Sequence, residues 1–142
     1  MSDADTDLVQ TAQELRTVLG RLVRRLRVED TLPLRYMTVL GLLEREGPLT
    51  TSALAQRERM RPQSMAETIK ELEQDGLLAR APDPEDGRRI LLTLTAAGTR
   101  TVREHRARRQ EWLAAAIDRE LGVSDQRVLA RAIRLLERLV DS

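Results

Sequence analysis

The chain has 142 residues, of which 41% are hydrophobic and 33% are charged, and this length predicts one domain or compact subunit. Its formal net charge is only +1, so any nucleic-acid binding must depend on local clusters of basic residues. The absence of cysteine excludes disulfides and thiolate metal sites. The acidic start MSDADTDLVQ is no secretory signal and no apolar run approaches the roughly 20 residues of a membrane span, so we expect a cytoplasmic protein without a membrane partner.

The first predicted helix has an apolar stripe whose members step by four and by three residues, the period of one helix face. They are Leu8, Ala12, Leu15, Leu19, Leu22 and Leu26. Val9, Val18 and Val23 widen this face beyond what so small a subunit can cover with its own core. A second copy of the chain is the natural cover, so we expect a homodimer.

The next segments predict a helix–turn–helix motif. Pro33 suits the first turn of a second helix that ends near Gly47. Thr50 is predicted to cap a short helix, because its hydroxyl oxygen can accept a bond from an N–H of the first turn. Pro62 then opens a further helix, and Gly76 lies just past its end. Two helices joined by so short a turn are typical of this motif.

A β-hairpin and two helices follow. Two short apolar segments, residues 77–81 and 90–94, flank the charged stretch DPEDGRR and predict the hairpin. A long helix is predicted from about residue 95 to residue 121, and Ser124 is predicted to cap a last helix.

Three helices followed by a two-stranded hairpin form the pattern of a winged helix-turn-helix. We therefore predict a mainly α (α+β) fold in which residues 1–142 form one subunit. Residues 31–95 are predicted to form its DNA-binding part.

The helix after Pro62 is the predicted DNA-reading element. On a helical wheel Met65, Ile69 and Leu72 share one side, which we expect to face the core. The candidates for DNA contact lie opposite that side or on its flank: Gln63, Ser64, Glu67, Thr68 and Lys70. Glutamine can pair with adenine through two bonds, and serine can serve several base edges. A glutamate can accept a bond from a cytosine amine, although it also repels phosphates.

Basic and hydroxyl side chains near this helix are candidates for phosphate contacts. Arg57, Arg59 and Arg61 precede it, and Thr51 and Ser52 open the helix before it. Free backbone N–H groups at a helix start also suit a phosphate. The alternative is that the arginines of this turn are only solvated.

The hairpin tip predicts a contact with the minor groove, where arginine meets concentrated negative potential. Arg88 and Arg89 are the candidates. We expect Asp86 to orient Arg88 through a hydrogen bond, while Asp83 and Glu85 shape the turn. The alternative is a solvated tip with surface ion pairs worth about 0–1 kcal/mol.

These motifs together resemble the MarR (multiple antibiotic resistance regulator) family, over a match from about Leu8 to Leu139. The resemblance is most specific in GPLTTSALA, in ELEQDGLLAR and in DPEDGRRILLTLTAAG. The last segment is similar to the family wing, whose Asp-x-Arg pair matches Asp86 and Arg88. Two positions depart from the family pattern. Arg61 stands where the family often has Ser or Thr, and Glu67 stands where it often has Arg, so the operator sequence cannot be transferred from relatives.

The resemblance implies a homodimeric transcription regulator that dimerises through residues 5–30 and 96–142. It implies that the helix after Pro62 enters the major groove and that the wing arginine enters the minor groove of a pseudo-palindromic operator in double-stranded DNA. It further implies a repressor of its own or a neighbouring operon, released by a small aromatic or anionic effector. Arg16 and Tyr36 are candidates to line the effector cavity, with core or interface packing as the alternative for each.

Other classes of protein lack their motifs. The chain has no Gly-rich phosphate loop and no Gly-x-Ser-x-Gly motif, and its single histidine, His105, supplies neither a metal site nor a hydrolytic triad. We therefore predict no enzyme activity, no metal and no cofactor. His105 is expected on a helix surface or at an interface, and five arginines of the long helix are expected to be solvated: Arg100, Arg103, Arg106, Arg108 and Arg109. The near-neutral charge leaves open a winged-helix protein-interaction module without sequence-specific DNA binding.

Overall fold

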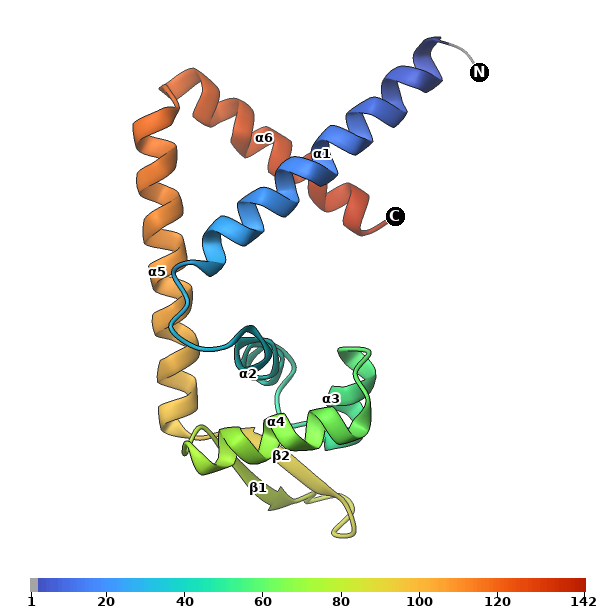
Figure 1. Cartoon of the computed structure of the whole chain (residues 1–142), viewed down its shortest axis with the longest axis vertical. Coiled ribbons are helices and arrows are strands. Elements are labelled where there is room, and N and C mark those ends of the chain that lie inside the picture. The colour runs from blue at the N-terminus through green and yellow to red at the C-terminus, as the bar shows by residue number, and fades with distance from the viewer. Residues whose placement is uncertain (1–2) are drawn as a thin grey trace.

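The computed structural model describes residues 3–142 (Figure 1). A two-stranded antiparallel sheet accompanies six helices in this part of the chain, so the predicted mainly α (α+β) winged-helix class is confirmed. The elements in chain order are α1 (Asp3–Arg27), α2 (Leu34–Glu46), α3 (Thr51–Arg57), α4 (Pro62–Gln74), β1 (Leu78–Pro82), β2 (Ile90–Leu94), α5 (Ala96–Glu120) and α6 (Val123–Val140).

Local sequence signals define the two short helices of the motif. The Thr50 hydroxyl accepts a bond of 3.1 Å from the Ala53 N–H and caps α3, as predicted. α4 ends at the predicted glycine, because Gly76 has a φ of +75° and the Leu77 N–H donates to the Leu72 carbonyl. α3 ends in the same way with Arg59, at a φ of +51°, in the left-handed position. A non-glycine residue there carries a steric cost, which makes this turn a strained connection.

The hairpin pairs β1 with β2 in antiparallel register, from Leu78 opposite Leu94 to Pro82 opposite Ile90. β1 begins one residue later than the predicted segment. Leu49 adds an isolated bridge to Leu92, so the connection between α2 and α3 is joined to the hairpin by two backbone hydrogen bonds. These bonds fix the hairpin beside the helix–turn–helix. We call α2, α3, α4, β1 and β2 together the winged unit.

The core lies inside the winged unit, closed by the first turns of α5. Its largest fully buried side chains are Val39, Leu40, Leu54, Met65, Ile69, Leu72 and Leu92. Gly98 allows α5 to approach the end of α4 closely, because a Cβ at this position would lie 2.1 Å from the backbone oxygen of Leu77. The core therefore depends on a glycine in the first turn of α5.

The remaining helices extend away from this core. In Figure 1 the winged unit lies at one end of the molecule, and α5 leads from it to α6 at the other end. Several large apolar side chains of α1 and α6 are exposed: Leu8, Val9, Val18, Leu19, Leu22, Val23, Val123, Val128, Ile133, Leu135, Leu139 and Val140. Figure 1 and these exposures together show two long helices with apolar faces that the chain itself leaves open.

The predicted cap of the last helix is wrong. Gly122 occupies the N-cap position of α6 without a side-chain bond, and Ser124 lies inside the first turn. The chain is extended at Gly122 and the helix begins at Val123, two residues earlier than a serine cap at position 124 would place its first residue. The Gln126 side chain donates a bond of 2.9 Å to the carbonyl of Leu121, just before the helix.

Candidate nucleic-acid interface

α4 presents a polar side to solvent and an apolar side to the core. Met65, Ile69 and Leu72 are buried, as predicted. Four of the five candidates for DNA contact on this helix are exposed: Gln63, Ser64, Glu67 and Lys70. Pro62 opens the helix, and its N-cap residue makes no side-chain bond. The N–H groups of the first turn thus remain open beside the exposed side chains of that turn.

The fifth candidate on α4, Thr68, does not fit the predicted role. Its side chain is buried, and its hydroxyl donates a bond of 3.2 Å to the carbonyl of Ser64. The position lies on the flank of the helical wheel, and the neighbouring elements cover that flank. Thr68 therefore packs α4 against neighbouring elements, and its burial does not support a direct contact with DNA.

Glu71 is held by two side chains of α2. Arg35 donates a bond of 2.8 Å to its carboxylate, and the Tyr36 hydroxyl donates one of 2.9 Å to the same oxygen. The bonds from Arg35 and then from Tyr36 hold the pKa of Glu71 below its usual value. Burial and then the bond to Glu71 raise the pKa of Tyr36. These contacts attach the second half of α4 to the start of α2.

Tyr36 and Arg16, the two candidates for an effector cavity, lie in different surroundings. Tyr36 is buried in the core and its hydroxyl is bonded to Glu71, so its observed role is packing. Arg16 is exposed in the middle of α1.

The basic residues around the motif fall into two groups. Arg59 and Arg61 are exposed in the turn between α3 and α4. Arg57 is also partly exposed, but its Nε donates bonds of 2.8 and 3.0 Å to the two oxygens of Glu46. At the start of α3 Ser52 is exposed and Thr51 is half-buried. Arg59 and Arg61 are thus better placed for a phosphate than Arg57, which already has an anionic partner.

The wing tip has the contacts that its sequence predicted around Arg88. Asp86 Oδ1 accepts bonds from the Arg88 Nε at 3.3 Å and from the Arg88 backbone N–H at 3.1 Å. Asp83 accepts a bond of 2.9 Å from the Glu85 N–H and so shapes the turn. The Arg88 side chain is 93% exposed, and Arg89 is exposed beside it. The tip therefore holds an arginine in one direction while leaving its charge open to solvent.

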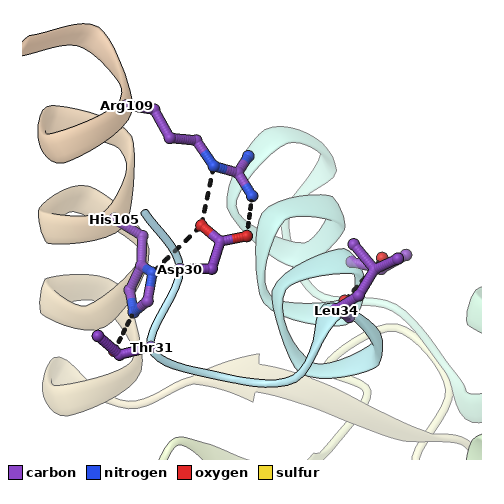
Figure 2. A network of polar contacts seen from close by, with 6 residues as sticks. Asp30, Thr31, Leu34, His105 and Arg109 are labelled. Carbon is purple, nitrogen blue, oxygen red and sulfur yellow. Dashed lines mark hydrogen bonds and ion pairs between the residues drawn. The ribbon is translucent and has the colours of Figure 1, made fainter. Parts of the chain in front are cut away.

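A buried polar network joins α5 to the segment between α1 and α2 (Figure 2). Asp30 accepts bonds from two nitrogens of Arg109, one of them the Nε at 2.9 Å. His105 Nε2 lies 3.2 Å from the Thr31 hydroxyl, and its Nδ1 lies 3.5 Å from an Asp30 oxygen. His105 is buried, so its predicted surface or interface position is wrong. The Thr31 hydroxyl is the hydrogen-bond partner of Nε2, whereas Nδ1 lies beside the Asp30 carboxylate without a hydrogen bond.

The arginines of α5 divide in the same way. Arg109 bonds to Asp30, and Arg106 bonds to Glu44. The prediction that these two arginines are only solvated is therefore wrong. Arg108 is half-buried, whereas Arg100 and Arg103 are exposed. The partners of Arg106 and Arg109 lie 62 and 79 positions away in the chain, and no local pattern signals such a pairing.

The described residues were also compared with the requirements of a metal site and of a membrane-spanning helix. Among the described residues, no group of three or more histidine or acidic side chains is arranged to hold a metal ion. None of the helices within residues 3–142 is long and apolar enough to cross a membrane.

Comparisons with known proteins point to one family. Residues 30–89 match a family model described as the MarR family. The chain is 38% identical to an HTH-type transcriptional regulator of Mycobacterium tuberculosis, over 99% of this chain and 98% of the relative. It is similar to the solved structure of a transcriptional regulator protein from Pseudomonas aeruginosa, with 37% identity, a TM-score of 0.86 and coverage of 100% and 99% of the two chains. It shares its fold with a MepR mutant of S. aureus bound to an oligodeoxyribonucleotide, at 18% identity, a TM-score of 0.68 and coverage of 91% and 97%.

Proposed function

This chain belongs to the MarR family, and we propose that it is a homodimeric, sequence-specific repressor of its own or a neighbouring operon. Its relatives establish the coarser statement, that it is a DNA-binding transcriptional regulator and not an enzyme. The observation that carries the proposal is the pairing of two open surfaces on one unit. The first turn of α4 exposes Gln63 and Ser64, and the wing tip exposes Arg88, which Asp86 orients.

Each surface suits a different groove of double-stranded DNA. The side chains of α4 suit the major groove, where base edges differ in their pattern of donors and acceptors. Arg88 and Arg89 suit the flanking minor groove, where the potential is most negative in narrow A·T segments. Arg59 and Arg61, with Ser52, are proposed to contact phosphates between these two points. Two subunits related by two-fold symmetry then require a pseudo-palindrome with half-site centres about 10 bp apart.

The dimer is proposed from the apolar faces of α1 and α6. Leu22, Leu139 and their neighbours form surfaces too apolar for solvent, and a second copy would bury them. The proposed division of the subunit follows the sequence analysis. Residues 31–95 bind DNA, and residues 5–30 and 96–142 form the dimer.

Control by a small aromatic or anionic effector is part of the proposal only as a family property. The packing of Tyr36 against Glu71 supports no effector role for that residue, and Arg16 alone does not define a site. We propose that any effector acts by changing how the winged unit is held relative to α1 and α5. The part-buried Asp30–Arg109 pair joins α5 to the segment that connects α1 to the winged unit.

The test is fluorescence anisotropy with DNA from upstream of the gene, at several salt concentrations and with scrambled DNA as control. We expect tight binding to the upstream DNA alone, weakening steeply with salt because bound phosphates release counterions. Arg88→Ala should weaken binding by roughly 1–3 kcal/mol.

The competing candidate is a winged-helix protein-interaction module, favoured by acidic residues such as Glu67 on α4. Equal, weak and salt-insensitive binding to both DNAs would support it. Tight upstream binding that Arg88→Ala leaves intact would contradict the wing assignment alone.

A further inference from the structure

α4 carries more acidic than basic side chains, which is unusual for a helix that must enter a field of phosphates. Glu67, Glu71 and Glu73 lie on it, and Lys70 is its single basic residue. A carboxylate near phosphates opposes binding unless another group compensates its charge. The structure shows which of these acids are compensated within the chain.

Two of the three acids are neutralised by arginines of the winged unit. Glu71 is bonded to Arg35 of α2 at 2.8 Å. Glu73 accepts bonds from the Nε and an Nη of Arg80 in β1, at 2.8 and 2.7 Å. The bond to Glu73 is also the main reason that the pKa of Arg80 is raised. Both carboxylates are therefore directed at neighbouring elements of the same subunit.

Glu67 is different. It is exposed, and it lies between Gln63 and Lys70 on the outward side of α4, one turn from each. Among the described residues no ion pair or side-chain hydrogen bond that we observe involves it. One uncompensated carboxylate thus remains on the surface proposed to face DNA.

A carboxylate can only accept hydrogen bonds, so its partners in a major groove are few. Guanine presents two acceptors there and thymine presents an acceptor and a methyl group. Adenine presents a donor next to an acceptor, and only cytosine presents a donor without an adjacent acceptor of its own. A carboxylate at this place therefore favours cytosine and opposes the other bases by leaving its own charge unsatisfied.

We propose that Glu67 is a specificity-determining residue that reads the amino group of one cytosine in each half-site. The proposal rests on the proposed function, since it requires that α4 enter the major groove. Arg35 and Arg80 have the supporting role of neutralising Glu71 and Glu73, which leaves Glu67 as the one acid that discriminates between bases.

The first experiment selects binding sites from a random duplex library with the full-length protein. The wild type should select a symmetric site with an invariant C·G pair in each half. Glu67→Gln should lose that preference or change it towards A·T, because an amide can pair with adenine, while the other positions stay the same. Glu73→Gln is the matched control, the same change on the same helix at an acid already paired with Arg80, and it should select the wild-type site.

The second experiment removes the amine from the base. The invariant cytosine of the selected site is replaced by 2-pyrimidinone, which lacks the amino group, with the same replacement outside the half-sites as control. The wild type should lose about 5- to 160-fold in affinity, the usual effect of one wrong base pair. Glu67→Ala should bind both DNAs equally, because the acceptor is already gone.

The outcomes separate the two proposals. If the wild type selects a site and Glu67→Gln selects the same site with the same affinity, this inference is overturned and the proposed function stands. Equal losses for wild type and Glu67→Ala on the replaced base would overturn it as well. If the wild type selects no sequence at all, the proposed function fails and the inference fails with it.

Discussion

The winged unit and the pair α1 and α6 use apolar residues in opposite ways. In the winged unit Leu40, Leu54 and Ile69 are wholly buried among residues of the same chain. In α1 and α6 the same type of side chain is open to solvent, since Leu8 is 68% exposed and Leu139 is 62% exposed. The difference teaches that the chain encodes two kinds of stability. One is complete within the subunit, and the other is absent from the single chain and would be supplied by the proposed dimer.

The largest effect is expected from a substitution that disrupts the proposed dimer contact of α1. Leu22→Glu puts a charge into the apolar face of α1, and burying it against another helix would cost more than the contact provides. We expect a folded monomer by light scattering. Thr17→Glu, on the opposite side of the same helix, should stay dimeric. A folded dimer of the Leu22 variant would show that this face is not the interface.

Leu54→Ala tests the first kind of stability. The side chain has no exposed surface and sits between α3 and the rest of the winged unit, so its truncation should cost about 2–5 kcal/mol. Leu34→Ala makes the same change at a side chain that is 46% exposed, and it should cost within about 0.5 kcal/mol. Urea unfolding measures both. Equal losses would mean that the core is not where the structure places it.

Gly98→Ala tests the joint between the winged unit and α5. The new methyl group would meet the Leu77 carbonyl, a backbone atom that cannot move aside alone, and we expect a loss of about 1–3 kcal/mol. Gly41→Ala, in the middle of α2, meets only the end of the Arg45 side chain. It should be neutral or stabilise by up to about 1 kcal/mol. Thermal unfolding compares the two variants, and a stable Gly98 variant would exclude this close approach.

The smallest effect concerns the contact of α4 with α2. The bonds from Arg35 and Tyr36 lower the pKa of Glu71 in the folded state, so this contact stabilises the fold above the usual pKa of the carboxyl. That stability is lost as the pH falls through the lower, folded-state pKa. Wild type should therefore unfold at a slightly higher temperature than Glu71→Gln at pH 7, and the gap should close in acid. A gap that does not change with pH would mean that the carboxylate charge is not involved.

The sequence predicted what depends on neighbours in the chain. Thr50 and Gly76 act within one helical turn, and the hairpin and the Asp86–Arg88 contact depend on residues a few positions apart. The sequence did not predict what depends on distant partners. His105 and Thr31 are 74 positions apart. Thr68 lies on the flank of a helical wheel, and the burial of a flank depends on the packing of neighbouring elements, which the wheel does not contain.

The most direct test of a dimeric DNA-binding protein is its stoichiometry by analytical ultracentrifugation, measured for the protein alone and with its upstream DNA. We expect a particle of twice the 16.1 kDa chain mass in free solution and two subunits on one pseudo-palindromic site. A folded monomer that binds this DNA one to one, with undiminished affinity for a single half-site, would contradict this expectation. The winged unit would then read DNA alone, and the apolar faces of α1 and α6 would need another explanation.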